Sequence, residues 1–159
     1  MAAPTTPKLY PFSNNVYVSA QVSEDAAKSI IESNHIKHVI NLRPSTEEGF
    51  VDNSNFADKF HVKYSSFPIS GVTAVNRDKV LEYRSLLQQT NEPTLVYCKS
   101  GLRGIVLQVL NEALAQNKTV EDVLKEEQQL SFPYPNDTMK QGFIKTLTDV
   151  VSASTGTSQ

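Results

Sequence analysis

The feature that most constrains the fold is a regular alternation of short apolar segments with longer segments of helical spacing. The short segments are dominated by β-branched and aromatic residues or alternate apolar with polar ones, which is typical of strands. They span 15–20, 38–42, 62–67 and 94–97, and helical spacing follows at 23–34, 55–60, 76–90 and 105–116. Strands alternating with helices favour a mostly parallel sheet covered on both faces. The sequence therefore predicts a three-layer α/β domain with a mostly parallel, four- or five-stranded sheet.

Capping residues support the helix boundaries. Ser23 and Asn76 stand where N-caps are expected, and Thr119 with Asp122 has the spacing of a capping box that opens a helix to about 129. A last helix is expected after residue 136. Pro44 ends the strand before it, because proline donates no hydrogen bond to a strand ladder.

The chain of 159 residues has the length of one ordinary domain. Residues 1–13 contain three prolines and are expected to form an extended lead-in, followed by one α/β domain over 14–151. Residues 152–159 are rich in Ser, Thr and Gly, and a flexible tail is expected there. No internal repeat or domain linker is evident.

Composition excludes several classes of protein. With 39% hydrophobic and 20% charged residues, the chain is of the ordinary globular kind, and its net charge of -2 gives no general attraction to nucleic acid or to anionic membranes. No apolar run approaches the roughly 20 residues that span a bilayer. The single cysteine makes no internal disulfide, so a reducing cytoplasmic location is expected. The three histidines lack metal-ligand spacing, and neither metal nor cofactor is predicted.

The most informative segment is the loop that joins strand 94–97 to the following helix. Ligands of parallel α/β sheets bind beyond the carboxyl ends of the strands, where Cys98 lies. Free amides at a helix start, with Lys99 and Arg103 nearby, favour a cysteine thiolate and suit an oxyanion. Gly101 lets the backbone approach such a ligand. The alternative is a buried structural cysteine before a plain connection.

Four landmarks give this pattern a family resemblance. They are Val18–Gln21, Val39–Pro44 with Glu47 and Glu48 behind it, Phe67–Pro68, and Val96–Arg103. Their order and spacing over 16–113 resemble the phosphatase-like domain family named after bacterial beta-lactamase-hydrolase-like proteins. That family is similar to the dual-specificity and tyrosine phosphatases. The resemblance leaves the C-terminal helices uncovered.

The resemblance implies a metal-independent phosphatase acting on a phosphorylated substrate. Cys98 would attack phosphorus and form a thiophosphoryl intermediate, which water then hydrolyses. Arg103 and the loop amides would bind the phosphate oxygens. The phosphate-binding residues implied in this way are Lys99, Ser100, Gly101, Leu102 and Arg103.

Three further residues are candidates for the same site. An aspartic acid on a neighbouring loop commonly serves as general acid in the wider superfamily. Ser70 stands where such an Asp is expected, and Asp78 is the next carboxylate along the chain. Arg43 follows a strand at the same sheet edge as Cys98, where it either frames the pocket or pairs with Glu47 or Glu48.

The loop differs from the usual HCxxGxxR signature followed by Ser or Thr. Tyr97 replaces the histidine, four residues instead of five separate Cys98 from Arg103, and Gly104 replaces the hydroxyl residue. We therefore expect weak or leaving-group-dependent phosphatase activity. Two alternatives stay open. CKSGLR is similar to the CRSGxR active loop of rhodanese sulfurtransferases, and a phosphate-binding module without efficient chemistry would keep the same loop.

Overall fold

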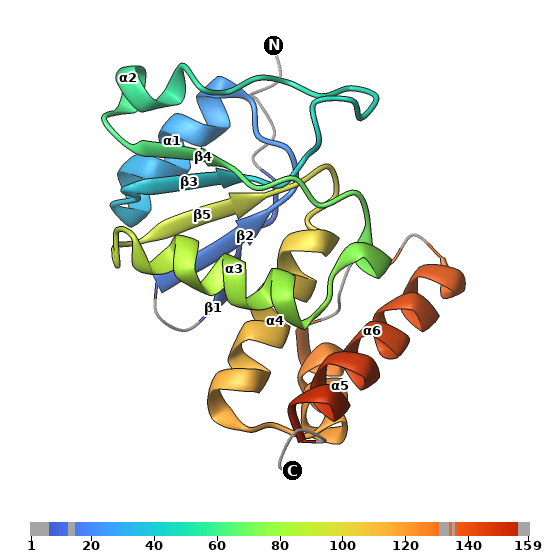
Figure 1. The fold of residues 1–159 in the computed structure, drawn as a ribbon. Helices are drawn as coiled ribbons and strands as arrows, with labels where there is room; N and C mark the ends of the chain where they lie inside the picture. Colours follow the sequence, from blue (N-terminus) through green and yellow to red (C-terminus); the bar gives the residue numbers. More distant parts are fainter. Residues whose placement is uncertain (1–6, 13–14, 131–133, 135, 156–159) are drawn as a thin grey trace.

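The computed structural model describes residues 7–12, 15–130, 134 and 136–155, which contain one five-stranded sheet. The strand order is β1-β2-β5-β3-β4; β1 is antiparallel to β2, and the other neighbours are parallel (Figure 1). The strands are β1 (Tyr10–Phe12), β2 (Val16–Ser19), β3 (His38–Asn41), β4 (Lys63–Ser66) and β5 (Thr94–Tyr97). The predicted mostly parallel sheet is confirmed.

Helices cover both faces of the sheet, so the predicted three layers are also confirmed (Figure 1). One face carries α1 (Glu24–Asn34) and α2 (Phe56–Phe60). The other side carries the short 3-10 helix η2 (Val72–Ala74) and the helices α3 (Arg77–Gln88) and α4 (Leu102–Gln116). Helix α6 (Asp137–Thr155) packs outside them against α4 and η2, and α5 (Val120–Leu130) contacts α6. The larger apolar cluster lies on this second face and has α4 at its centre.

The predicted caps form as expected. The Ser23 hydroxyl accepts a hydrogen bond from the Ala26 amide at 3.1 Å, and the Asn76 side chain accepts one from Lys79 at 2.8 Å. Thr119 and Asp122 exchange reciprocal bonds at 3.0 and 3.1 Å, which completes a capping box. Local sequence therefore determines where these helices begin.

The two chain ends differ from expectation. Within the predicted lead-in, residues 10–12 form the edge strand β1, in register with 16–18 of β2. Pro11 is compatible with this position because an edge strand leaves one row of backbone groups unpaired. At the other end, α6 continues through Thr155, so residues 152–155 of the predicted tail are helical. Residues 156–159 lie outside the described part of the chain.

Helix α4 begins earlier than the sequence pattern predicted, at Leu102 instead of Ile105, so Arg103 and Gly104 are in its first turn. Gly101 precedes the helix with φ of 95°, a left-handed conformation that favours glycine. A Cβ on Gly104 would lie 2.7 Å from a methyl carbon of Val18. The glycine after Arg103 therefore lets α4 pack closely on β2.

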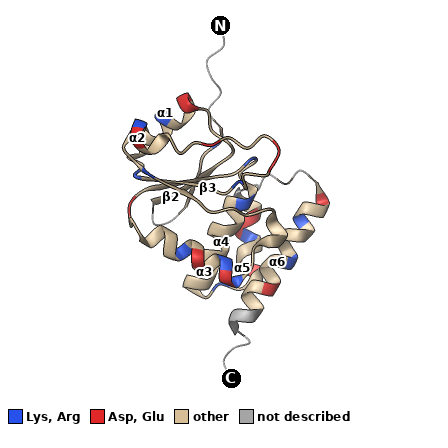
Figure 2. Cartoon of the chain, turned by 45° about the horizontal axis from the view of Figure 1, so that its top comes forward, with Lys and Arg blue, Asp and Glu red and all other residues tan. Residues whose placement is uncertain are grey.

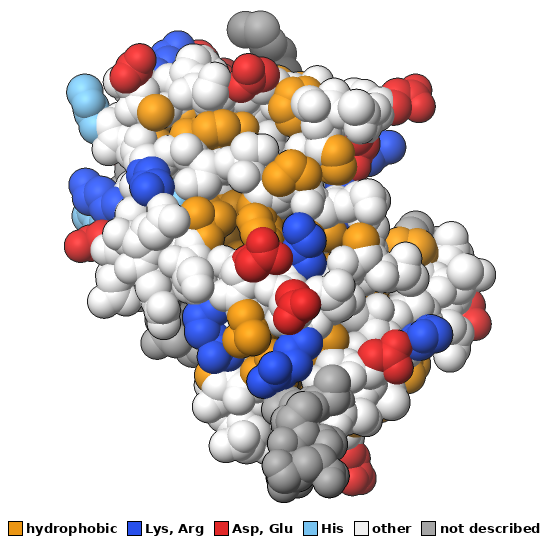
Figure 3. Space-filling model, in the orientation of Figure 1, with side chains coloured by type: hydrophobic (Ala, Val, Ile, Leu, Met, Phe, Trp, Pro, Cys, Tyr) orange, Lys and Arg blue, Asp and Glu red, His pale blue; other side chains and the backbone are white. Residues whose placement is uncertain are grey.

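Charged side chains of both signs are interspersed along the helices (Figure 2). The face seen in Figure 3 likewise mixes acidic, basic and hydrophobic side chains. No helix in the described part of the chain is long and apolar enough to cross a bilayer. Over the same residues, no three His, Cys, Asp or Glu side chains gather in a way that could hold a metal ion.

Candidate functional site

The loop after β5 is tied to the end of β2. The Cys98 amide donates to the Ser19 carbonyl at 3.4 Å, and the Gln21 amide donates to the Lys99 carbonyl at 3.3 Å. A Cβ on Gly101 would lie at an ordinary contact distance of 3.4 Å from the Ala20 nitrogen, so the loop lies directly against the end of β2, and the positive φ is what favours glycine here. These contacts fix the loop beyond the carboxyl ends of two parallel strands, where the sequence predicted a ligand site.

Cys98 lies beneath this loop with no exposed surface. The Gly101 amide donates a hydrogen bond to its sulfur at 3.1 Å. The Arg103 side chain is near enough to Cys98 for the two groups to interact electrostatically. The sulfur thus lies close to both a loop amide and a guanidinium.

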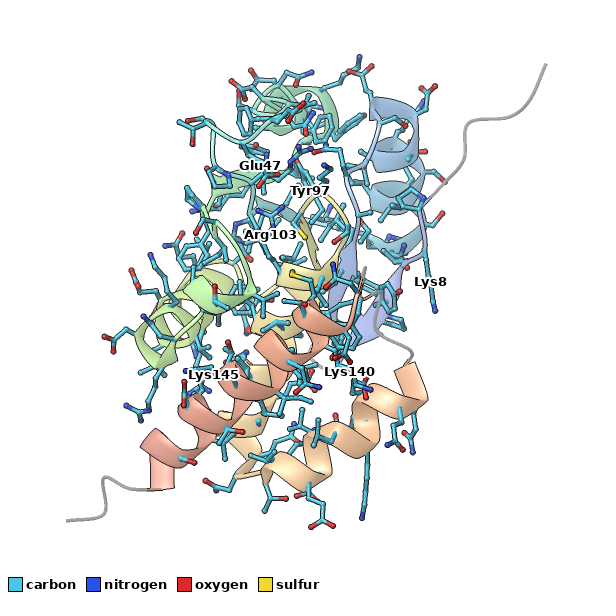
Figure 4. All side chains as sticks on the ribbon, turned by 90° about the vertical axis from the view of Figure 1, so that its right-hand side faces the viewer. Lys8, Glu47, Tyr97, Arg103, Lys140 and Lys145 are labelled. Carbon is cyan, nitrogen blue, oxygen red and sulfur yellow. The ribbon has the colours of Figure 1, made fainter. Side chains whose placement is uncertain are left out.

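Arg103 is held by a carboxylate from a distant part of the chain. Its Nη1 donates to Glu47 Oε1 at 2.6 Å and to the Ile69 carbonyl at 2.7 Å, while Nη2 donates to Glu47 Oε2 at 3.1 Å. Figure 4 shows Glu47 and Arg103 near each other in the upper half of the view. Burial lowers the pKa of Arg103, but the bonds to Glu47 and the proximity of Cys98 outweigh it and raise the pKa overall. The guanidinium therefore stays charged beside the sulfur.

Glu47 bridges two buried arginines. Arg43 Nε donates to Glu47 Oε2 at 2.6 Å, and the rest of its guanidinium donates to Gln21 and to the Glu48 carbonyl, each at 2.8 Å. The hydrogen bond from Arg103, followed by that from Arg43, holds the pKa of Glu47 below its ordinary value despite partial burial. Of the two roles expected for Arg43, the loop salt bridge is confirmed, since Arg43 is buried behind the pocket.

Several loop amides remain available to a ligand. Among the described residues, the backbone N–H groups of Lys99, Ser100 and Arg103 have no acceptor. The Leu102 amide donates to the Ser100 hydroxyl at 3.4 Å, a long bond. Free amides at the start of a helix of 15 residues are a suitable environment for an oxyanion.

A cavity of about 320 Å³ opens beside the loop. Its walls come from the loop after β3, the turn around η2, the Cys98–Arg103 loop and the first turn of α6; the residues are Glu47, Glu48, Ser70, Gly71, Val72, Lys99, Ser100, Leu102, Arg103 and Met139. The structure thus brings four of the predicted phosphate-binding residues and Ser70 together, with Gly101 and Cys98 behind them. The phosphate-binding roles themselves stay predictions.

Asp78 is not brought to this cavity. It is exposed in the first turn of α3 and lines a different cavity, with Lys145 and Asp149 of α6. The expectation that Asp78 is a general acid therefore receives no support from its position. The carboxylates that line the loop cavity are Glu47 and Glu48.

Tyr97, which stands in place of the usual histidine, faces the opposite side of the sheet from Cys98. Its hydroxyl donates to Asn53 at 2.5 Å, and its ring packs in the smaller apolar cluster beneath α1. Burial raises the pKa of Tyr97 far above its ordinary value. The tyrosine thus anchors the segment that carries Glu47, and it contributes no charge to the loop.

Two contributors to the site are not evident from the sequence. The sequence predicts Glu47 near Arg43 but gives no sign of its contact with Arg103, which lies 56 residues further along the chain. Met139 reaches the cavity from α6, and no sequence signal identified it. The Glu47–Glu48 landmark was the one available hint of the first contact.

Comparisons with known proteins show one similar sequence. No family model matches the chain. A beta-lactamase hydrolase-like protein from Agrobacterium fabrum is 31% identical over 93 residues, which is 54% of this chain and 21% of that protein. The predicted resemblance is thus confirmed, although the chain spans about a fifth of that relative's length.

Solved structures extend the likeness to the C-terminal helices. TpbA of P. aeruginosa in complex with phosphotyrosine is 20% identical, with a TM-score of 0.74 over 97% of this chain and 91% of that one. The chain has the α/β fold of the dual-specificity-like phosphatases. A putative phosphatase from Shewanella putrefaciens (18% identity, TM-score 0.71, 91% of this chain and 88% of that one) shares this fold. The catalytic core of a PP-IP phosphatase from S. cerevisiae also shares it, with 22% identity and a TM-score of 0.64 over 94% of each chain.

Proposed function

We propose that this protein is a metal-independent, cysteine-based phosphatase that hydrolyses phosphomonoesters. The observation that carries the proposal is the contact of Cys98 with both Gly101 and Arg103 in a loop that leaves amides free at a helix start. This arrangement pairs a nucleophile with donors for phosphate oxygens, and the fold supports it. A cytoplasmic location remains a prediction.

The reaction has two displacement steps at phosphorus. Cys98 sulfur attacks, an S–P bond forms, and the ester P–O bond breaks as the alcohol or phenol leaves. Water then attacks the phosphorylated cysteine, the S–P bond breaks, and inorganic phosphate is released. Because Cys98 has no exposed surface, the first step requires the sulfur to become accessible to the substrate.

Arg103 and the loop amides would stabilise the charge that develops on the transferred phosphoryl group. Three of the guanidinium's five N–H groups donate to Glu47 and Ile69. Nε–H and one Nη2–H have no acceptor among the described residues, and an edge with two donors matches two phosphate oxygens. In this proposal Glu47 fixes the guanidinium so that this edge faces the sulfur.

No aspartate of the described residues lines the loop cavity, which supports the expectation of leaving-group dependence. Asp78 lines another cavity, and Glu47 is ionised between two arginines, so neither is suited to protonate a leaving group. Substrates with acidic phenols need little protonation and should react fastest. The sulfurtransferase alternative is not favoured, because two of the similar structures reported above are named as phosphatases.

A paired assay tests the proposal. Hydrolysis of 4-nitrophenyl phosphate and transfer of sulfur from thiosulfate to cyanide are measured for the wild type and for Cys98→Ser. We expect phosphate release by the wild type, its loss in Cys98→Ser, and no sulfur transfer. Sulfur transfer without phosphate release would contradict the proposal. If neither activity appears while phosphate still raises the melting temperature, the protein is a phosphate-binding module.

A further inference from the structure

The cavity beside the Cys98–Arg103 loop has two unlike walls. Lys99, Ser100 and Arg103 form the polar wall at the loop. Val72, Leu102 and Met139 form an apolar wall; the first two are buried, and Met139 is partly buried against the main core. A molecule held by its phosphate at the loop would lay its remaining part against the apolar wall.

The charges that line the cavity are balanced. Arg103 is paired with Glu47. Lys99 and Glu48 are exposed, and neither side chain has a partner among the described residues. The Glu48 backbone is fixed, because its carbonyl accepts a hydrogen bond from buried Arg43 at 2.8 Å. The cavity lining therefore contains one unpaired cation, Lys99, and one unpaired carboxylate, Glu48.

This balance disfavours a substrate with several phosphates. The first phosphate would engage Arg103, Lys99 and the loop amides. A second or third phosphate would meet Glu48 with no further cation among the lining residues. Like charges a few ångströms apart repel by about 1 kcal/mol even in water, and more at a partly closed surface.

Building on the proposed function, we propose that the site selects phosphomonoesters of uncharged, apolar alcohols or phenols and rejects polyphosphates. Glu48 and Met139 are the residues that determine this specificity. Glu48 repels additional phosphate groups, and Met139 contacts the organic part of the substrate. Helix α6, which lies outside the sequence resemblance over 16–113, thereby contributes to substrate choice.

The test compares kcat/KM for 1-naphthyl phosphate and for ATP in the wild type and in Glu48→Lys. The wild type should prefer 1-naphthyl phosphate. The substitution changes the local charge by two units and should raise the ratio of ATP to naphthyl phosphate kcat/KM by about tenfold. Glu32→Lys makes the same charge change at an exposed position of α1, on the other face of the sheet, and should leave the ratio unaltered.

Met139 provides a second arm of the same test. Met139→Gln keeps the length of the side chain but makes it polar, and it should raise the KM for naphthyl phosphate about threefold to tenfold. Met139→Leu should restore the wild-type KM, because it restores an apolar contact of similar volume.

The outcomes separate this inference from the proposed function. Cys98-dependent hydrolysis of naphthyl phosphate with an unchanged substrate ratio in Glu48→Lys would overturn the inference alone. A wild type that prefers ATP would do the same. A wild type that hydrolyses neither compound would overturn the proposed phosphatase function and this inference with it.

Discussion

The two ends of the same sheet bury polar groups in opposite ways. At the carboxyl end, Arg43, Glu47 and Arg103 form a charged network next to Cys98. At the amino end, His38 lies fully buried at the start of β3, with its ring nitrogens 2.7 Å from the Ser65 hydroxyl and 3.3 Å from that of Thr90.

The two ends differ in how many of their buried hydrogen-bonding groups have a protein partner. Both ring nitrogens of His38 have a hydroxyl partner, and burial, followed by the charge of Lys63, lowers the pKa of His38 to about 4, so the ring stays neutral. At the other end, the network keeps its charges and leaves an edge of Arg103 and several amides without protein partners in the described part of the chain. Buried polar groups that are fully paired contribute to structure, whereas ionised groups with spare donors are suited to a ligand.

The largest effect is expected at Arg103. Arg103→Lys keeps one positive charge but loses the two-donor edge beside Cys98, so kcat/KM for an aryl phosphate should fall roughly 10²–10³-fold. Steady-state kinetics measures this change. Arg84→Lys is the matched control, because Arg84 bonds Asn111 between α3 and α4, away from the cavity. A wild-type kcat/KM in Arg103→Lys would contradict the functional difference between the carboxyl and amino ends of the sheet.

A smaller loss of activity is expected at Glu47. Glu47→Gln removes the charge that holds both arginines, so Arg103 loses its fixed orientation and kcat should fall about tenfold to 100-fold. Glu47→Asp should recover part of the loss because it restores the carboxylate. Glu24→Gln, which breaks an exposed pair with Lys59, should leave kcat unchanged. A rise in kcat/KM for Glu47→Gln would mean that Glu47 blocks the ligand edge instead of positioning it.

The smallest expected effect concerns the pH dependence of stability at the two ends. The folded-state pKa of His38 is about 4, below its ordinary 6.5, so the unfolded chain binds a proton first. Stability from neutral His38 is present above pH 6.5 and is lost as the pH falls towards 4. Glu47, whose pKa is also lowered, contributes stability that is lost only below its ordinary 4.5.

Urea unfolding at several pH values separates the two contributions. In His38→Asn, the free energy of unfolding should change less than in the wild type between pH 6.5 and 4, with kcat unaffected. In Glu47→Gln, the free energy of unfolding should become less dependent on pH only at lower pH. If the free energy of unfolding changes equally with pH in His38→Asn and in the wild type between pH 6.5 and 4, the interpretation of His38 as a neutral, buried histidine is wrong.

Local sequence signals account for most of the fold and for part of the site. The caps at Ser23 and Asn76 and the strand ending at Tyr97 follow from nearest-neighbour chemistry, and the order of the elements follows from their alternation. The start of α4 was not predicted because it depends on packing between elements. A side chain at Gly104 would collide with Val18 of β2.

The unpredicted parts of the site are contacts between distant segments. Glu47 contacts Arg103 only because β3 and β5 are neighbours in the sheet. The local sequence of either segment does not predict that strand order. Met139 depends on how α6 packs against α4 and η2, which no local pattern reveals. Local pattern identified Cys98 and Arg103, while the side chains around them follow from the fold.

The most direct test of the central claim is detection of phosphate on Cys98 during turnover. The wild type is mixed with an aryl phosphate, quenched in acid within the first turnovers, and digested for mass spectrometry. We predict that the peptide containing Cys98 gains the mass of one phosphoryl group, and that the gain is absent in Cys98→Ser. Continued hydrolysis of the aryl phosphate by Cys98→Ser, with no modified peptide in the wild type, would contradict the account.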